Sequence, residues 1–114
     1  MQWSSFDGDQ TAALTRGTSE CPSCGALALR RYLTTPERAR RPTLVTYVWC
    51  SACRKFVGTR TAHPQGLVFA DPLVTHPPAD GSLAGFLAHL DRLWDAGVLP
   101  QTFAGAPPWT AANS

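Results

Sequence analysis

Three segments in the first half of the chain have the residue pattern of β-strands. They are residues 26–34, 43–49 and 55–61. In the first segment Leu27, Leu29 and Leu33 share one face, with Arg31 as the exception on that face. The second is dense in β-branched and aromatic residues, which favour strands. A polar loop bounded by two prolines, 35–42, joins these two segments, so we predict a three-stranded antiparallel sheet.

The clearest helical pattern lies in residues 82–97. Its apolar residues recur at intervals of three and four, as one buried face of a helix requires, and they are Leu83, Phe86, Leu87, Leu90 and Trp94. Ser82 is a suitable N-cap, Gly97 suits the position just after the helix, and Pro100 prevents its continuation. We predict that Leu87 and Leu90 lie at the centre of the buried face and that the helix packs on the sheet.

Length and composition indicate one small domain with much irregular chain. The chain has 114 residues, of which ten are proline and nine glycine, and only 16% are charged. The longest apolar run, 67–70, is too short to cross a bilayer. The first residues carry neither a basic start nor an apolar stretch. We therefore expect a cytoplasmic protein with no membrane span and no secretory signal.

The four cysteines form two pairs of identical spacing. Cys21 and Cys24 make one C-x2-C unit, Cys50 and Cys53 make the other, and 25 residues separate them. Such paired units are typical of a tetrahedral Zn²⁺ site with four thiolate ligands. Since four sulfurs leave no open coordination position, one structural zinc ion is predicted, without a catalytic role. Two disulfides, a redox-active pair and a four-thiolate iron centre are the alternatives.

One C-x2-C unit precedes the first predicted strand and the other lies between the second and the third. With this order, the sequence around Cys21-Pro22-Ser23-Cys24-Gly25 and Cys50-Ser51-Ala52-Cys53 resembles the zinc-ribbon superfamily over residues 20–61. This resemblance implies a three-stranded sheet clamped by metal at one end. Zinc ribbons occur in transcription factors, RNA polymerase subunits, ribosomal proteins and adaptor modules, so the resemblance leaves the function open. The ribbon of transcript-cleavage factors has an acidic pair at the hairpin tip. Here that loop holds Glu37 among arginines, which argues against the same activity.

Together these elements predict a small α+β fold, a three-stranded zinc-ribbon sheet with a C-terminal amphipathic helix packed on it. The expected organisation is an N-terminal segment (1–19), the ribbon (20–61), an extended linker (62–81), the helix (82–97) and a C-terminal tail (98–114).

Positive charge is concentrated in the ribbon. Residues 21–61 hold eight basic residues and one acid, whereas both flanks are mildly acidic. The candidate binding residues are five arginines of the first hairpin, Arg30, Arg31, Arg38, Arg40 and Arg41. Their guanidinium groups suit phosphate and carboxylate alike, but such a cluster is also compatible with a merely solvated face. Arg54 and Lys55 are expected to offset the negative charge of the metal–thiolate centre.

Catalytic motifs are missing from the sequence, so we expect no enzymatic activity. There is no phosphate loop, no Rossmann glycine pattern and no G-x-S-x-G. His63, His76 and His89 are scattered and are not expected to bind the metal. Tyr47 and Trp49 offer rings on which bases could stack, although aromatic residues in a strand are more often part of the core.

Two functional hypotheses follow. The first is a non-catalytic protein that binds nucleic acid or the transcription machinery through the basic hairpin. The second is an adaptor or a toxin-neutralising, immunity-type protein that binds a protein partner through its acidic and apolar C-terminal half. In that case Trp94, Phe103 and Trp109 would form the exposed contact patch. The excess of arginine over lysine and the sixteen alanines are typical of a GC-rich bacterial genome.

Overall fold

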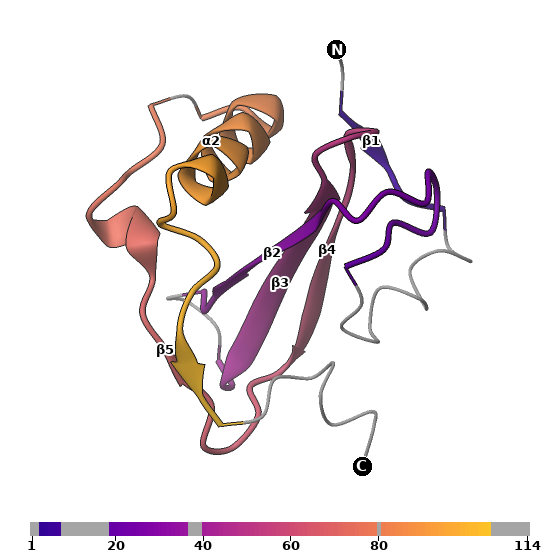
Figure 1. Cartoon of the computed structure of the whole chain (residues 1–114). Coiled ribbons are helices and arrows are strands. Elements are labelled where there is room, and N and C mark those ends of the chain that lie inside the picture. The colour runs from indigo at the N-terminus through magenta and orange to yellow at the C-terminus, as the bar shows by residue number, and fades with distance from the viewer. Residues whose placement is uncertain (1–2, 8–18, 37–39, 80, 106–114) are drawn as a thin grey trace.

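The computed structural model describes residues 3–7, 19–36, 40–79 and 81–105. Its elements in chain order are β1 (Ser4–Ser5), β2 (Leu29–Thr34), β3 (Thr43–Cys50), β4 (Lys55–Ala62), β5 (Val68–Phe69), the 3-10 turn η1 (Pro72–Val74), α2 (Leu83–Asp95) and β6 (Phe103–Ala104). Strands β2, β3 and β4 form a sheet, and α2 lies on its β2 side (Figure 1). The predicted α+β fold class is thus confirmed.

The main sheet has four strands in the order β1-β4-β3-β2. The two predicted hairpins are present, since β2 pairs with β3 and β3 with β4, both antiparallel. The prediction of three antiparallel strands was wrong in one respect, because β1 adds a fourth strand that runs parallel to β4. Backbone bonds hold it, from Ser4 N–H to the Arg54 carbonyl and from Phe6 N–H to the Phe56 carbonyl, both 3.0 Å. Two polar residues give no alternation of apolar and polar positions, so this strand had no signal in the sequence.

Strand β2 begins later than the sequence pattern suggested. Leu29, Arg31 and Leu33 do share one face, since they pair in turn with Cys50, Val48 and Thr46 of β3. Leu27 lies before the strand and is 81% exposed. The chain is still leaving the first cysteine turn at this point, so Leu27 does not join the sheet.

Both faces of the sheet are covered by apolar side chains. On the face toward α2 the core consists of Tyr32, Trp49, Leu90, Leu93 and Leu99. The other face carries two clusters. Near the cysteines the cluster is Phe6, Cys21, Leu29, Val48 and Cys50, and toward the β2–β3 loop it is Leu33, Leu44 and Leu67. Burial of these side chains is the main favourable contribution to folding.

Helix α2 begins and ends as its sequence predicts. The Ser82 hydroxyl accepts a hydrogen bond from the Gly85 amide at 3.0 Å, and Gly97 has a φ of 82°. Leu87 and Leu90 are completely buried, which confirms that they lie at the centre of the apolar face. In the described part of the chain, no helix is long and apolar enough to cross a membrane.

One carboxylate joins the helix to two strands. Asp91 of α2 accepts from the Arg30 guanidinium at 2.8 Å and from the Trp49 indole N–H at 3.0 Å, both at Oδ1. Arg30 also bonds to Asp95 at 3.0 Å, and its guanidinium carbon lies 5.6 Å from the centre of the Trp94 ring. The side chains of Arg30 and Asp91 are each only 17% exposed. This polar group therefore fixes the angle at which α2 meets β2 and β3.

The segment expected to be an extended linker contains ordered elements. Strand β5 pairs with β6, and Asp71 caps η1 through the Leu73 amide at 2.9 Å. The same carboxylate accepts from the Tyr32 hydroxyl at 2.6 Å. Burial raises the pKa of Tyr32, and the bond to Asp71 raises it further, so the hydroxyl remains protonated and donates. Asp71 thereby ties this segment to β2.

A glutamine side chain covers the outer edge of β2. The Gln101 amide accepts from Leu33 N–H and donates to the Leu33 carbonyl, both at 2.8 Å, and also donates to the Ala70 carbonyl at 2.9 Å. It pairs with Leu33 as a neighbouring strand would. An exposed strand edge can pair with other chains, and this contact closes part of that edge.

We predict that Asp91→Ala lowers the free energy of unfolding by about 2 kcal/mol, because the Arg30 and Trp49 donors both lose their acceptor. Asp95→Ala is the matched control, since Asp95 is 66% exposed and its loss should cost less than about 1 kcal/mol. Urea unfolding of the two variants measures the difference. Equal effects would show that the bonds to Asp91 do not hold the helix.

Candidate metal centre

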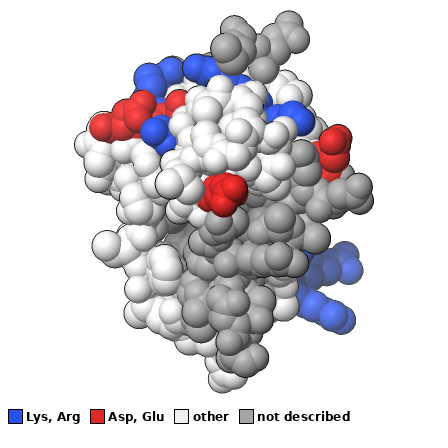
Figure 2. All heavy atoms as spheres, turned by 45° about the vertical axis from the view of Figure 1, so that its right-hand side comes forward, with Lys and Arg blue, Asp and Glu red and all other residues white. Residues whose placement is uncertain are grey.

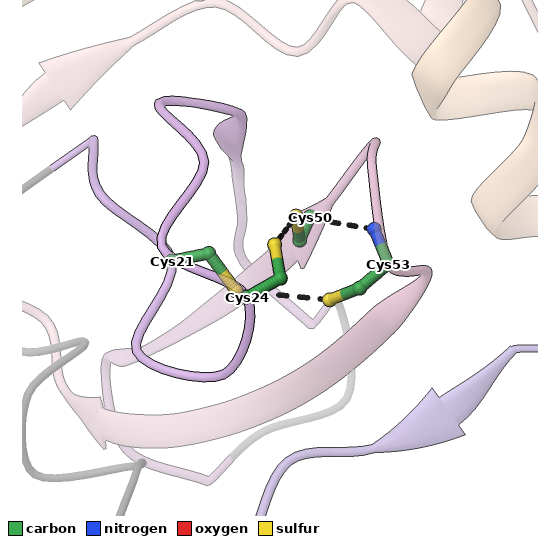
Figure 3. Close-up of side chains that lie close together, drawn as sticks. All are labelled: Cys21, Cys24, Cys50 and Cys53. Carbon is green, nitrogen blue, oxygen red and sulfur yellow. Dashed lines mark hydrogen bonds between the residues drawn. The ribbon is translucent and has the colours of Figure 1, made fainter.

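The fold brings the four predicted metal ligands together at one end of the sheet. Cys21 and Cys24 lie in the turn before β2, while Cys50 ends β3 and Cys53 lies in the turn to β4. All four sulfur atoms lie within 4.8 Å of one another. Figure 3 shows the two turns facing each other, with the cysteine side chains between them. The four cysteines therefore form a cluster that can hold one metal ion.

The distances within the cluster fit a four-thiolate metal site. Two pairs of sulfurs from opposite turns, Cys21 with Cys53 and Cys24 with Cys50, are each 3.7 Å apart. A tetrahedron with metal–sulfur bonds of about 2.3 Å has edges of about 3.8 Å. A disulfide would need a sulfur–sulfur distance of about 2.05 Å, and all four cysteines are free thiols. The geometry therefore favours a metal site over the alternative of two disulfides.

The two cysteine turns have the same backbone design. The residue after each pair donates to the carbonyl of the first cysteine, Gly25 to Cys21 at 2.9 Å and Arg54 to Cys50 at 3.0 Å. Both have positive φ, 77° at Gly25 and 60° at Arg54. Glycine adopts this conformation readily, whereas arginine is strained there. The strain is offset at Arg54 by a cation–π contact, since its guanidinium carbon lies 5.2 Å from the centre of the Trp3 ring.

Burial and hydrogen bonding affect the four thiols differently. Cys21 and Cys50 are buried, Cys53 is half-buried and Cys24 is exposed. The Ala26 amide lowers the pKa of Cys24, whereas burial raises the pKa of Cys50 and raises that of Cys53 to about 12. Amides also face the sulfurs, from Ser23 to Cys21 at 3.4 Å and from Cys53 to Cys50 at 3.5 Å. Without a cation, at least Cys50 and Cys53 keep their protons at neutral pH.

Of the five arginines predicted to bind a partner, the four that the structure describes do not form one group. Arg30 is held by Asp91 and Asp95, on the face of β2 toward α2. Arg31 points to the other face, where burial lowers its pKa. Arg38 lies outside the described residues. Only Arg40 and Arg41 are both described and exposed at the β2–β3 loop.

The loop arginines border an open hollow that sequence reasoning missed. The hollow measures about 500 Å³, and Arg40, Arg41, Thr43 and His63 are among the residues that line it. His63 directly follows β4, whose last residue the register places opposite the start of β3, so a hairpin prediction with a defined register could have found it. In Figure 2 the Lys and Arg side chains fall into two groups, one at the top beside acidic side chains and one low on the right.

The histidines and strand aromatics take structural positions. Trp49 is completely buried, and the Tyr47 ring packs against Phe86 with ring centroids 5.1 Å apart. Trp49 and Tyr47 therefore belong to the core, as is more usual for aromatic residues in a strand than a role in base stacking. Nε2 of His63 lies 2.8 Å from the Leu67 carbonyl, and Nε2 of His89 lies 2.6 Å from the His76 carbonyl. Within the described residues the metal cluster contains cysteines alone.

Comparisons with known proteins gave no match to a family model, to a curated protein or to a solved structure. The resemblance to zinc ribbons thus rests on the cysteine spacing and on the cluster that the fold forms from it.

We predict that the purified protein contains one metal ion per chain and that Cys50→Ser loses both the metal and cooperative thermal unfolding. Cys50 is buried, and a small sheet of this kind depends on the metal for stability. Elemental analysis and thermal melting measure the two effects. Ser51→Ala, in the same turn, is the control and should keep the metal. A parent protein without metal would contradict the prediction.

We also predict that metal affinity falls as the pH is lowered. The raised pKa values of Cys50 and Cys53 mean that binding must displace at least two protons at neutral pH. The apparent association constant should therefore rise by at least about two decades per pH unit between about pH 6 and pH 8. A titration against a competing chelator at several pH values measures this slope. A slope near zero would show that the thiols are not the ligands.

Proposed function

We propose that the protein is a non-catalytic binding protein of the zinc-ribbon type, in which one structural Zn²⁺ holds the fold and the opposite end of the sheet binds nucleic acid. The observation that carries the proposal is the placement of the two features at opposite ends of β3. Cys50 ends this strand, whereas Arg40 and Arg41 precede its first residue, Thr43. Seven residue steps at about 3.3 Å separate these ends by about 23 Å.

Zinc is the metal we propose for the cysteine cluster. Four thiolates suit zinc and a rubredoxin-type iron centre alike, so the ligand set alone does not choose between them. The basic, aromatic hairpin that joins the two cysteine turns favours the zinc-ribbon assignment. Four sulfur ligands saturate Zn²⁺, so the ion would stabilise the fold and would not activate water. We further propose a reducing compartment such as the cytoplasm, where free thiols persist.

Charge at the loop end supports a polyanionic partner. Arg40, Arg41 and Arg60 are exposed there. Asp71, a carboxylate of the segment that follows β5, is engaged by Tyr32 and Thr34 of β2. The acidic residues of α2 weaken the positive potential of these arginines less than their number suggests, because Asp91 and Asp95 are paired with Arg30. Arginine side chains on such a surface can neutralise phosphates and release counterions.

A protein partner is the second candidate, and exposed apolar side chains on η1 and α2 favour it. Val74 is 82% exposed and Leu83 is 51% exposed. The patch would differ in part from the one expected from the sequence, of which Phe103 is exposed. Trp94 is half-buried between Trp49 and Arg30, and Trp109 lies outside the described residues. An adaptor or immunity-type protein would use such a surface.

We predict that the metal-loaded protein binds duplex DNA with a salt-dependent affinity, and that replacing both Arg40 and Arg41 by Ala reduces the slope of log K against log salt by about two units. Each duplex phosphate contact contributes about −0.9 to that slope. Stability should be nearly unchanged, because exposed charges contribute little to folding. Fluorescence anisotropy at several salt concentrations measures the slope.

Arg92→Ala is the matched control, since Arg92 is an exposed arginine on α2. It should leave the slope of the parent unchanged. An unchanged slope in the double variant would overturn the assignment of the loop end. Absence of salt-dependent binding by the parent to both DNA and RNA would overturn the nucleic-acid function and leave the protein partner as the remaining candidate.

A further inference from the structure

His63, the residue that follows β4, is tied to the loop that carries Arg40 and Arg41. Its backbone N–H donates to the Pro42 carbonyl at 3.0 Å, and its side chain lines the same hollow as the two arginines. The Thr43 hydroxyl donates to the Arg41 carbonyl at 2.9 Å, which holds the end of the loop. The imidazole ring therefore borders the same space as the arginines proposed to contact phosphate.

Two contacts fix the orientation of the His63 ring. Nε2 lies 2.8 Å from the Leu67 carbonyl oxygen. The ring also stacks on Phe69 of β5, with ring centroids 5.9 Å apart and an angle of 16° between the planes. Because these contacts already position the half-buried ring, a ligand would lose little affinity to ordering it.

The bond to Leu67 also determines which nitrogen of His63 carries the proton. A carbonyl oxygen only accepts hydrogen bonds, so Nε2 is the donor. A neutral imidazole has one N–H and one acceptor nitrogen, and histidine is mostly neutral above about pH 7. Nδ1 is therefore an acceptor, and no hydrogen bond within the described part of the chain engages it.

An acceptor nitrogen in a hollow lined by arginines does not suit a phosphodiester alone. The phosphate oxygens are acceptors too, so they can pair with Arg40 and Arg41 but not with Nδ1. The group that fits Nδ1 is a hydroxyl that donates a hydrogen bond close to a phosphate. The ribose 2′-hydroxyl, which distinguishes RNA from DNA, is such a group, because its carbon adjoins the one that bears the 3′-phosphate.

The hollow has room for one nucleotide unit. Its volume of about 500 Å³ falls in the range of about 300–1,000 Å³ typical of ligand sites. None of the described residues that line it is acidic, and Pro36 and Pro42 add apolar wall against which a sugar can pack. A phosphate and its ribose would therefore meet no negative charge from these residues.

We propose that the loop end binds RNA in preference to DNA, with phosphates at Arg40 and Arg41 and a ribose 2′-hydroxyl donating to Nδ1 of His63. This inference rests on the proposed nucleic-acid function and narrows it to one class of nucleic acid. The arginines supply affinity for any nucleic acid, whereas His63 determines the specificity.

The test compares single strands of one sequence, without uracil or thymine, made as RNA, as DNA and as 2′-fluoro RNA. Each is titrated against the full-length, metal-loaded protein above about pH 7, with fluorescence anisotropy as the measurement. The fluoro sugar keeps an RNA-like conformation but has no hydroxyl to donate. We expect RNA to bind at least about threefold more tightly than the other two strands, as one hydrogen bond allows. Equal binding of RNA and 2′-fluoro RNA would overturn the proposal.

His63→Phe keeps a ring that can stack on Phe69 and removes Nδ1, so it should bind the three strands with equal affinity. Its slope of log K against log salt should match that of the parent, because no phosphate contact is lost. Gln65→Ala changes an exposed residue of the following turn and should keep the preference for RNA. If His63→Phe does not fold, the comparison of RNA with 2′-fluoro RNA by the parent still decides the question.

The outcomes separate this proposal from the function on which it rests. Salt-dependent binding of all three strands with equal affinity, or a preference for RNA that survives in His63→Phe, would overturn the role of His63 alone. Absence of salt-dependent binding to every strand would overturn both. The Arg40→Ala and Arg41→Ala double variant should bind each strand more weakly and keep the ratio of RNA to DNA affinity, since the arginines contact phosphate.

Discussion

Four cysteine sulfurs held within 4.8 Å of one another are the constraint on which the rest of this structure depends. They connect the turn before β2 to the turn between β3 and β4, so one cluster fixes the ends of three strands. Such a cluster is unfavourable without a cation, because closely spaced thiolates repel one another and burial raises the pKa of Cys50 and Cys53. A bound divalent ion makes the clustered, deprotonated state favourable, since it stabilises every thiolate at once.

The polar contacts of Asp91 extend this organisation from the sheet to the helix. Its carboxylate meets Arg30 of β2 and Trp49 of β3, and Trp49 is followed directly by the ligand Cys50. The position of α2 is therefore linked to the strand that ends in one of the four cysteines. One consequence is functional, because an arginine that seemed available for binding has a structural role. Among the described residues, Arg40, Arg41 and Arg60 are the exposed arginines at the loop end.

Local patterns in the sequence were sufficient to predict the strands β2, β3 and β4, the helix α2 with its caps, and the grouping of the four cysteines. Each of these features is encoded by neighbouring residues, such as Ser82 at the start of α2 or the repeated C-x2-C spacing. Features that depend on distant residues were not predictable in the same way. Strand β1 is held by backbone bonds, and Gln101 binds a strand that precedes it by 68 residues.

The role of Asp91 did leave a signal that could have been used. It follows Leu87 by four residues and precedes Trp94 by three, so it lies beside the apolar face of the helix. An acidic residue there needs a buried partner, and Arg30 and Arg31 were the cations in the adjoining strand. The choice between them requires the register of β2 against the helix, which periodicity alone does not give.

The most direct test of the central claim is X-ray absorption at the metal edge of the protein as purified. The account predicts one zinc ion per chain, surrounded by four sulfur atoms at about 2.3 Å. A first shell with nitrogen or oxygen ligands, or a protein that carries no metal while its thermal unfolding remains cooperative, would contradict it.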